Sequence, residues 1–444
     1  MVAVAKPLTQ TFDVRQYGAV GDGTTDNTAA VQAAINAAIA AGGGCVFVPT
    51  GVFRCDSQLS IPTVAGGYWG SKSAPVRITG AVGANNNNES PSDTNLVSSQ
   101  GSTLDLRYSG SGAKLVALGT GVLQLDHLTL TDLGTSSTPF VLCTLAQPRF
   151  RDVVFAGNPS KSGTSCDQDA ILLGGTGDTR LPDDITSGFS GYGGYVDNCA
   201  FVRIRRAVYF RAHCNGVMVT RNWVDTTCGS NDTYGAPFEI DPGSGGARIA
   251  WSNIIRDNTI ELYGYKYGVL MANSSRNNVI AGNGFWDPGA ATLGAVKLDP
   301  DTCRDNRIIL DGYVHSSYRI VTGAGGSYGG SGYNWVDTST AQFCSWTDEY
   351  KPVTWKLHLK GEISDYHYIT YDATPDGPLL SGYGGVGIRS GGADKKISIR
   401  VGAGSPEGVV TGTVGDLYLN TTGSTSTTLY VKTSGTGNTG WTAK

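Results

Sequence analysis

The stretch "FDVRQYGAVGDGTTDNTAAVQAAINAAIAAGGGCVFVPTGVF", residues 12–53, carries the pattern that decides the fold. Apolar residues recur three and four positions apart over residues 30–39, which predicts a helix of about four turns with one apolar face. Asp26 or Thr25 is placed to cap the N-terminus of this helix, and the glycines at 42–44 end it. The segment "CVFVP" then predicts a short buried strand.

The Gly-rich turn before this helix does not fit a nucleotide-binding loop. Gly18, Gly21 and Gly23 follow the order G-x-x-G-x-G, and the residues TTD separate the last glycine from the helix. The dinucleotide fingerprint has the order G-x-G-x-x-G directly at the helix start, within βαβ units that this chain lacks. A calcium loop built from Asp22 and Asp26 is excluded in the same way, because the ligand spacing of such loops is missing. We therefore interpret these glycines as a structural turn.

Composition favours an all-β chain and excludes two classes of partner. Charged residues are 16% of the 444 residues and glycines number 63, which is typical of short strands joined by many turns. The net charge is −4 and the strongest basic cluster, at 203–211, holds four arginines, so we expect no nucleic-acid partner. Since no apolar run is long enough to span a bilayer, we also expect no membrane insertion. The N-terminus lacks the pattern of a secretory signal peptide.

The nine cysteines indicate free thiols rather than a metal or disulfide framework. Their number is odd and none forms a C-x-x-C pair, so a zinc site is not expected. Buried thiols formed in a reducing cytoplasm fit this pattern. We expect no metal and no other cofactor.

Asparagines mark a repeat in the middle of the chain. Each stands before a short apolar strand, as in "VDNCAFV" and "IRDNTIEL", and successive asparagines lie 24, 36, 25 and 23 residues apart. A period of this size is typical of a solenoid in which one repeat forms one coil. Asparagine suits the turns between strands because it tolerates left-handed backbone geometry and can bond along a ladder. The five repeat positions are Asn198, Asn222, Asn258, Asn283 and Asn306.

Both ends of the chain resemble known families. The run at 12–53 resembles the N-terminal segment of the pectate-lyase-like superfamily, which consists of right-handed parallel β-helix proteins and includes many phage tailspikes and polysaccharide-degrading enzymes. In that family the amphipathic helix closes the open end of the stack. The last forty residues or so, with "DLYLNT" and "TLYVKT", resemble a short module at the ends of many phage tail proteins.

These resemblances and the repeat together imply a domain organisation. We expect an all-β chain: a right-handed parallel β-helix with an N-terminal capping helix and a small C-terminal β domain. The expected parts are an N-terminal segment with the helix at 1–56, the β-helix at 57–345, an antiparallel region at 346–400 and a β module for trimerisation or binding at 401–444. Because a forty-residue module has little core of its own, we expect a homotrimer.

Paired carboxylates are the expected catalytic groups, since glycoside hydrolysis uses one carboxyl as acid and a second as base or nucleophile. In "PFEIDP" Phe238 and Ile240 are expected to face inward, so Glu239 and Asp241 point outward as the leading pair. The other candidates are two pairs and one single acid: Asp225 with Glu261, which become neighbours if they lie in adjacent coils, Asp167 with Asp169, and Asp299.

Aromatic and basic residues of the same repeats are the expected substrate-binding groups, because flat aromatic faces pack on sugar rings. The residues concerned are Tyr209, Arg211, Trp223, Tyr234, Tyr263, Tyr265, Lys266, Trp286 and Lys297. Arg211, Lys266 and Lys297 also suit a rival reaction, in which a base removes the C5 proton of a uronic acid and a cation neutralises its carboxylate. A calcium-dependent form of that lyase would use the acids at 239, 241 and 299.

The sequence thus predicts a tailspike-like depolymerase that hydrolyses a bacterial surface polysaccharide. It would act outside the cell as part of a phage virion, with the polysaccharide, its own copies and other phage tail proteins as partners. The alternatives are a polysaccharide lyase and a receptor-binding spike without catalysis. The sequence does not distinguish the sugar, the linkage or the host.

Overall fold

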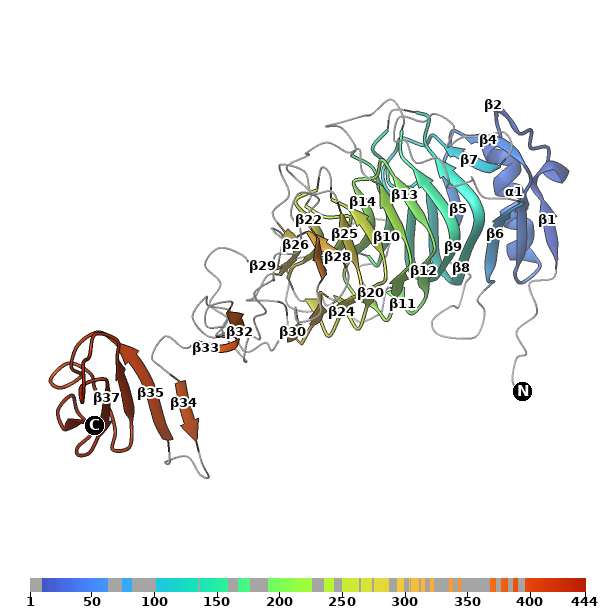
Figure 1. The fold of residues 1–444 in the computed structure, drawn as a ribbon. Coiled ribbons are helices and arrows are strands. Elements are labelled where there is room, and N and C mark those ends of the chain that lie inside the picture. The colour runs from blue at the N-terminus through green and yellow to red at the C-terminus, as the bar shows by residue number, and fades with distance from the viewer. Residues whose placement is uncertain are drawn as a thin grey trace, which may run out of the picture. The chain divides into compact units, whose positions relative to one another are not determined.

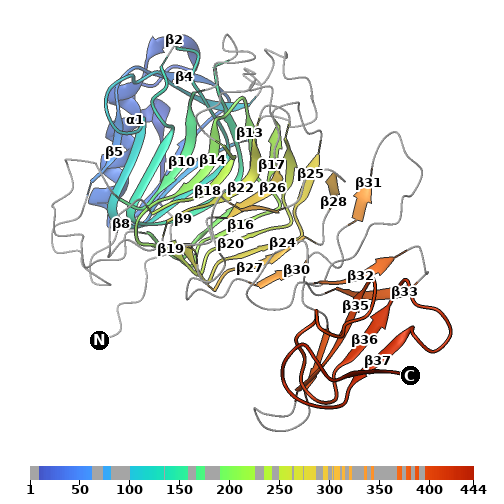
Figure 2. The same ribbon diagram turned by 90° about the vertical axis from the view of Figure 1, so that its left-hand side faces the viewer.

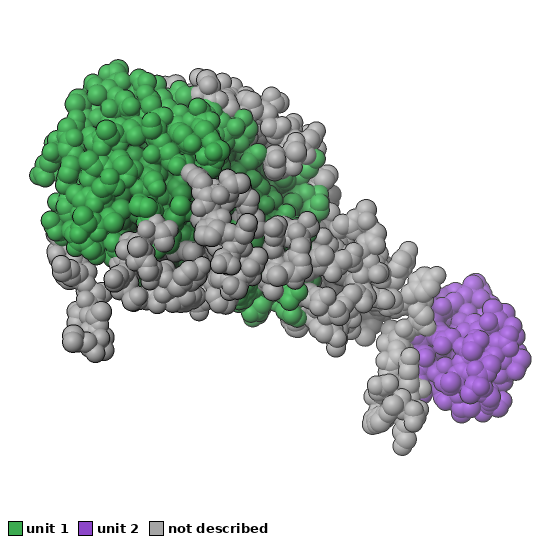
Figure 3. Space-filling model, turned by 180° about the vertical axis from the view of Figure 1, so that it is seen from behind, with its two compact units in different colours: residues 1–351 green, residues 352–444 purple. Residues whose placement is uncertain are grey.

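The chain forms two compact units, Met1–Lys351 and Pro352–Lys444 (Figure 3). The computed structural model describes residues 10–62, 74–81, 101–134, 136–158, 167–175, 191–225, 235–242, 250–262, 265–273, 275–286, 294–298, 303, 305–310, 313–315, 320–322, 335–337, 342–344, 368–372, 377–381, 386–389 and 396–444.

The first unit is a right-handed parallel β-helix (Figures 1 and 2), as the sequence predicts. Each coil contributes one strand to each of three columns, and strands of one column pair in parallel with those of the coils before and after. Two long strands, β8 (Leu115–Thr131) and β9 (Val141–Ala156), run through all three columns.

Three columns of strands build the stack, in the order first, second, third around each coil. The first column contains β1 (Thr11–Asp13), β3 (Gly44–Val48), β6 (Val76–Gly80), β12 (Tyr195–Asp197), β16 (Met218–Thr220), β20 (Ile254–Arg256), β24 (Val279–Ala281), β27 (Arg307–Ile309) and β30 (Trp335–Asp337). The second contains β2 (Asp22–Asp26), β4 (Gly51–Cys55), β7 (Ser102–Leu106), β13 (Ala200–Val202), β17 (Trp223–Asp225), β21 (Thr259–Glu261), β25 (Gly284–Trp286), β28 (Tyr313–His315) and β31 (Gln342–Cys344).

The third column and a small extra sheet complete each turn. The third column contains β5 (Leu59–Ile61), β10 (Asp169–Leu173), β14 (Arg206–Phe210), β18 (Phe238–Ile240), β22 (Tyr267–Met271), β26 (Gly294–Leu298) and β29 (Ile320–Thr322). Between the third and first columns lie β11 (Gly191–Tyr192), β15 (Cys214–Asn215), β19 (Ala250–Trp251) and β23 (Ser275–Arg276).

Strand alternation fills the inside of the stack with apolar side chains. In the first column one inward row runs through five consecutive coils, and every member is 0% exposed: Val46, Ile78, Leu125, Phe150 and Val196. Because neighbouring residues on each strand point to opposite faces, the residues on either side of this row face outward. The same alternation places Asp225 and Glu261 on the outer face of the second column and Glu239 on the outer face of the third.

The helix α1 (Thr28–Ala40) lies at the N-terminal end of the stack (Figure 1) and contacts β1, β3, β5 and β6. Its buried residues are Val31, Ala34, Ile35 and Ala38, which belong to the predicted apolar face. The N-cap position is Asn27, which makes no side-chain capping bond, so the expected cap at Asp26 or Thr25 was placed too early. The side chain of Asp26 still accepts a hydrogen bond from the backbone N of Thr28 at 3.0 Å. The helix ends where Gly42 takes a positive φ of 81°.

The Gly-rich turn is built for close packing. A Cβ on Gly21 would come within 2.9 Å of the Phe53 ring, and Gly23 has a φ of 73°. Asp22 accepts hydrogen bonds from the backbone of Thr24 and Thr25, and these bonds hold its pKa well below the ordinary value. The glycines of this turn therefore allow close packing against the first coils, and Asp22 stabilises the backbone of the turn.

Asparagine ladders hold two corners of the coil, where the sequence predicted one. Between the first and second columns Asn222, Asn258 and Asn283 stack, and the side-chain oxygen of each accepts from the residue one coil before. Asn306 belongs to a second ladder with Asn253 and Asn278. Asn198 belongs to neither ladder: Cys199 takes the ladder position, and Asn198 adopts a φ of 51° and bonds Asp152. The sequence placed the five repeat asparagines in one ladder. This was wrong because both corners use the same residue at similar spacing.

Replacing Asn258 by alanine is expected to destabilise the stack by about 2 to 4 kcal/mol, because buried partners lose their hydrogen bonds. Its side chain accepts from the backbone and amide of Asn222, both at 2.9 Å, and donates to Val219 and Asn283. Chemical unfolding followed by tryptophan fluorescence measures the loss. The matched control is Asn277→Gly, which removes one exposed bond at a left-handed position and should change stability by less than about 0.5 kcal/mol. Equal stability of both variants would contradict the ladder's role.

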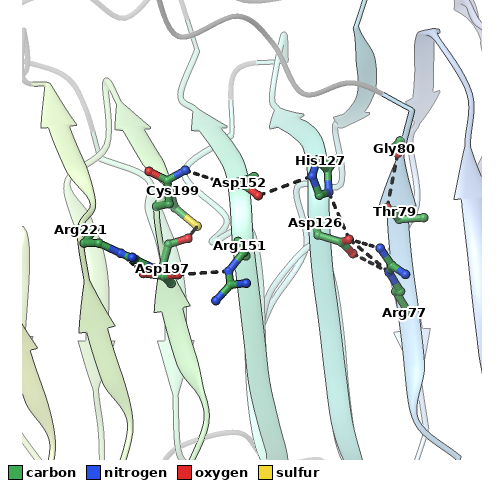
Figure 4. A network of polar contacts seen from close by, with 11 residues as sticks. Arg77, Thr79, Gly80, Asp126, His127, Arg151, Asp152, Asp197, Cys199 and Arg221 are labelled. Atoms are coloured by element: carbon green, nitrogen blue, oxygen red, sulfur yellow. Dashed lines mark hydrogen bonds and ion pairs between the residues drawn. The ribbon is translucent and has the colours of Figure 1, made fainter. Parts of the chain in front are cut away.

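Charged side chains link successive coils on the outer face of the first column (Figure 4). Asp126 pairs with Arg77 and lies 3.2 Å from His127, whose other ring nitrogen lies 3.5 Å from Asp152. Two coils further, Asp197 accepts hydrogen bonds from Arg151 and Arg221 (Figure 4). It also accepts one from the hydroxyl of Thr220. Burial works against the ionised form of Asp197, but the bonds from Arg221 and Thr220 outweigh it and hold its pKa below the ordinary value. These contacts fix the relative position of coils.

The second unit ends in a five-stranded sheet. Its strands are β34 (Val386–Arg389), β35 (Lys396–Gly402), β36 (Leu417–Asn420), β37 (Leu429–Lys432) and β38 (Trp441–Ala443), paired in that order. Before them β32 (Tyr368–Asp372) and β33 (Gly377–Ser381) form an antiparallel pair. The small C-terminal β domain predicted from the sequence is therefore present.

Candidate functional site

The turn between β13 and β14 brings three arginines to one corner of the stack. Residues 203–206 read Arg-Ile-Arg-Arg, and Arg203 has a φ of 53°, which sends the chain sharply from the second column into the third. Arg203 and Arg206 are buried, at 3% and 7% exposure. Buried guanidinium groups need counter-charges, and the acids of neighbouring coils provide them.

Asp169 is the main counter-charge of this corner. Its two oxygens accept from Nε and Nη2 of both Arg205 and Arg206, at 2.6 to 3.0 Å. Burial alone would raise the pKa of Asp169, but the four hydrogen bonds outweigh it and hold the pKa below its ordinary value. A carboxylate held ionised by two guanidinium groups is a poor proton donor, so this geometry favours a structural role for Asp169.

Glu239 faces outward from β18, as predicted, and meets the same corner. Phe238 and Ile240 are 0% exposed inside the stack, whereas Glu239 lies 3.3 Å from Nη1 of Arg206. Burial raises the pKa of Glu239, and the attraction of Arg206 offsets this only in part. The Arg206 guanidinium also lies over the ring of Tyr209, with its Cζ 3.8 Å from the ring centre. Glu239 is thus a carboxyl that keeps its proton to higher pH than an exposed glutamate.

Asp225 and Glu261 form a carboxyl pair on the outer face of the second column. β17 pairs with β21 so that Val224 faces Ile260, and Asp225 and Glu261 are the next residues of the two strands. Each of the two carboxyl groups influences the ionisation of the other, and a hydrogen bond between them needs a proton on one, because carboxylates only accept. Burial raises the pKa of Asp225; the bond from Glu261 and the charge of Arg203 lower it by less.

Two tryptophans flank this pair. The ring nitrogen of Trp223 donates to Oε1 of Glu261 at 3.3 Å, and Trp286 is the register partner of Glu261 in the next coil. Both tryptophans are half-buried. The indoles and the carboxyl pair thus occupy three consecutive coils on the outer face of one column.

The remaining candidates of the third column line one outer row. Tyr209, Glu239, Leu270 and Lys297 are consecutive register partners, so Lys297 lies in the expected row, two coils from Glu239. Asp241 is the first residue after β18, and its side chain accepts a hydrogen bond from Asn273. Three further candidates are half-buried: Asp167, Arg211 and Lys266. Tyr234, Tyr263 and Asp299 lie outside the described residues.

Tyr265 does not lie where the sequence placed it. We expected an exposed aromatic residue, but Tyr265 is 3% exposed and belongs to the core. Its hydroxyl donates to the carbonyl oxygen of Ile204 at 2.5 Å, in the arginine corner. The alternation in "ELYGYKYG" suggested an extended strand, but β22 begins only at Tyr267, and Tyr265 precedes it. A core tyrosine that fixes the corner backbone is the corrected interpretation.

Sequence reasoning missed the arginines as part of the site. Of the cluster at 203–211 we assigned only Arg211 to the site, and otherwise judged the cluster too small for nucleic acid. The signal available was the run Arg-Ile-Arg-Arg itself, because three arginines in four residues of an otherwise weakly charged chain require acidic partners. Among the residues that the structure describes, no group of three or more His, Cys, Asp or Glu side chains is placed to hold a metal ion.

The family of the chain follows from comparison with known proteins. The family model for rhamnogalacturonase A/epimerase, pectate lyase-like, matches residues 11–238. The chain belongs to this family. At that level it is a carbohydrate-active β-helix protein, and the family description names two different activities, so the reaction has to be argued from the site.

Individual relatives and structures resemble parts of the chain. Mannuronan C5-epimerase AlgE3 of Azotobacter vinelandii is 60% identical over 43 residues, which are 10% of this chain and 2% of that protein. The solved structure of ORF18 of Geobacillus virus E2 is 14% identical, with a TM-score of 0.43 over 98% of this chain and 86% of that one. A tailspike protein of E. coli bacteriophage HK620 is 12% identical, with a TM-score of 0.43 over 70% and 60% of the two chains.

Within the described ranges, none of the helices is long and apolar enough to cross a bilayer.

Proposed function

We propose that this chain is a depolymerase that hydrolyses glycosidic bonds of a bacterial surface polysaccharide, such as a capsule, O-antigen or exopolysaccharide. The observation that carries the proposal is the carboxyl pair of Asp225 and Glu261 on neighbouring strands, with Trp223 and Trp286 beside it and with burial raising the pKa of Asp225. A proton held in this way is what the leaving oxygen of a glycosidic bond needs.

The second carboxyl of the reaction is Glu239. Hydrolases of both stereochemical classes place their two carboxyl groups about 5 to 9.5 Å apart. Asp225 and Glu261 are the next residues after a register pair of neighbouring strands, so we assign them to one acid–base unit. Glu239 faces outward from the adjoining column, beyond the corner that Arg203 and Arg206 form, and it supplies the base or nucleophile.

The sequence resemblances extend this proposal to the whole molecule. The N-terminal segment and the C-terminal module both resemble parts of phage tail proteins, so the chain acts as a tailspike on the virion, outside the host cell. Three copies would associate, and other tail proteins would attach them. No observation on the described residues favours β-elimination over hydrolysis.

Incubation with a panel of capsules, O-antigens and exopolysaccharides tests the reaction. We expect new reducing ends without the ultraviolet absorbance of an unsaturated product, because hydrolysis adds water and leaves the ring saturated. Appearance of that absorbance would replace hydrolysis by elimination. If the polymers are bound but stay intact across the whole panel, the protein is a receptor-binding spike without catalysis.

A further inference from the structure

Two tryptophans flank the outer face of β21. Trp223 stands on β17, and its ring nitrogen lies 3.3 Å from Oε1 of Glu261 in the next coil. Trp286 stands on β25, the strand on the other side of β21. Its indole lies back along its own strand, because its ring nitrogen is 2.8 Å from the point that a Cβ of Gly284 would occupy. One indole therefore lies on each side of the strand that carries Glu261.

The strand between the two indoles presents a polar strip. Thr259 and Glu261 are its outward residues, because Ile260 between them is 0% exposed inside the stack. Thr259 is exposed and Glu261 is half-buried. Neighbouring strands lie about 4.8 Å apart, so the two strands that carry the tryptophans are about 9.6 Å apart. The strip thus has a hydroxyl and a carboxyl on its floor and an indole on either side.

Gly284 leaves the space in which the Trp286 indole lies. It is the register partner of Thr259, and it faces the same side of the sheet as Trp286, two residues later on β25. A Cβ at this position would lie 2.8 Å from Nε1 and 3.5 Å from Cδ1 of Trp286. The backbone does not itself call for glycine, since Gly284 is not one of the residues with a positive φ. The indole therefore explains why this position has no side chain.

We propose that the outer face of β21 binds one sugar ring of the polysaccharide between the two indoles, and that Gly284 is the positioning residue that keeps this subsite open. A sugar ring has an apolar face of C–H groups, which packs on aromatic rings, and hydroxyl groups, which bond polar side chains. The tryptophans provide the first kind of contact, and Thr259 and Glu261 provide the second. The inference rests on the proposed function, because Glu261 belongs to the carboxyl pair.

A methyl group at position 284 would displace the indole and little else. Among the described residues, the next atom that it would meet is the carbonyl oxygen of Asn258, at an ordinary contact distance of 3.9 Å. Because φ of Gly284 is not positive, alanine fits the backbone without strain. Gly284→Ala should therefore leave the stack intact while it moves Trp286 out of its place beside the strip.

A double-mutant cycle on polysaccharide binding tests the proposal. Binding is measured in chains that carry Asp225→Asn, so that the polymer stays intact, by titrating the panel of capsules, O-antigens and exopolysaccharides and following tryptophan fluorescence. For the polymer bound most tightly, Gly284→Ala and Trp286→Ala should each raise the dissociation constant about tenfold. Gly284→Ala added to Trp286→Ala should have no further effect, because no indole is left to displace.

Turnover and unfolding separate this positioning role from a structural one. In chains that keep Asp225, Gly284→Ala should raise KM and leave kcat nearly unchanged, because the lost contact is made in the ground state as well as the transition state. Its midpoint of unfolding in urea should equal that of the unsubstituted chain. Gly437→Ala is the matched control: it adds the same methyl group where no atom of the described residues lies within 4 Å, and it should leave binding unchanged.

Four results would each overturn the proposal. They are additive losses in the double variant, unchanged binding or a lower unfolding midpoint for Gly284→Ala, an equal loss of binding in Gly437→Ala, and no binding of the unsubstituted chain to any polymer of the panel. The proposed reaction fails in a different way. If the cycle gives the expected pattern but the unsubstituted chain releases no reducing ends, the subsite stands and hydrolysis is wrong.

Discussion

Replacing Asp225 by asparagine is expected to lower kcat/KM for polysaccharide hydrolysis by about 10²- to 10⁴-fold, which is the usual contribution of a positioned proton donor. The amide keeps the shape of the side chain but cannot release a proton to the leaving oxygen. Glu261→Gln should cause a loss of similar size, because Glu261 adjoins Asp225 in the pair and influences its ionisation. The double variant should be little worse than either single variant, since groups that act as a unit are not additive.

The pH profile separates a chemical role of Asp225 from a structural one. Burial raises the pKa of Asp225, so the carboxyl stays protonated above the ordinary range near 4. We expect kcat/KM of the unsubstituted chain to fall as the pH rises through this raised pKa. The residual activity of Asp225→Asn should lack that alkaline limb, because the amide does not titrate.

Two further variants complete this experiment. Glu239→Gln should also abolish hydrolysis while sparing binding of the polysaccharide, because Glu239 supplies the second carboxyl. Asp257→Asn is the control: Asp257 is an exposed acid in a surface pair with Arg256, with 46% of its side chain exposed. Turnover within twofold of the unsubstituted chain for Asp225→Asn would remove the pair from the reaction and leave Glu239 and Asp241 as candidates.

Features with a local cause could be predicted from the sequence. The apolar spacing over residues 30–39 and the glycines at 42–44 determine the capping helix and its end. Inward Phe238 and Ile240, with outward Glu239, follow from the period of two in a strand. The contact of Asp225 with Glu261 was also predictable, on the condition that the two lie in adjacent coils.

Features that depend on which coils become neighbours could not be predicted. Asp169 and Arg206 are 37 residues apart, and no local pattern shows that one coil separates them. Tyr265 was misplaced for the same reason: its partner Ile204 is 61 residues away. The asparagines were placed on one column because two corners of the coil use the same residue, and spacing alone does not assign a residue to a corner.

Replacing Asp169 by asparagine is expected to have the largest effect on stability, a loss of about 3 to 5 kcal/mol, because it leaves buried charges without their partner. The side chain of Asp169 is 2% exposed, and those of Arg205 and Arg206 are 18% and 9% exposed. Without the carboxylate of Asp169, Arg206 still has Glu239 as an acidic neighbour, 3.3 Å from its Nη1.

Asp257→Asn is again the matched control, because it also removes the acid of an Arg–Asp pair. The Arg256 and Asp257 side chains are 56% and 46% exposed, so water replaces the lost partner. An exposed pair of this kind contributes about 0 to 1 kcal/mol. Urea unfolding measures the free energy of unfolding of both variants, and the unfolding rate is measured beside it. Asp169→Asn should lose far more stability than Asp257→Asn.

The same comparison predicts a pH dependence with a definite sign. The pKa of Asp169 is lowered in the folded chain, so its contribution to stability is present above the unfolded value of about 3.9 and is lost as the pH falls through the lowered pKa. The stability of the unsubstituted chain should therefore decrease in acid more than that of Asp169→Asn, which has no carboxyl to protonate. A loss below about 1 kcal/mol at neutral pH, or the same acid response in both chains, would show that the arginine corner is held by other contacts.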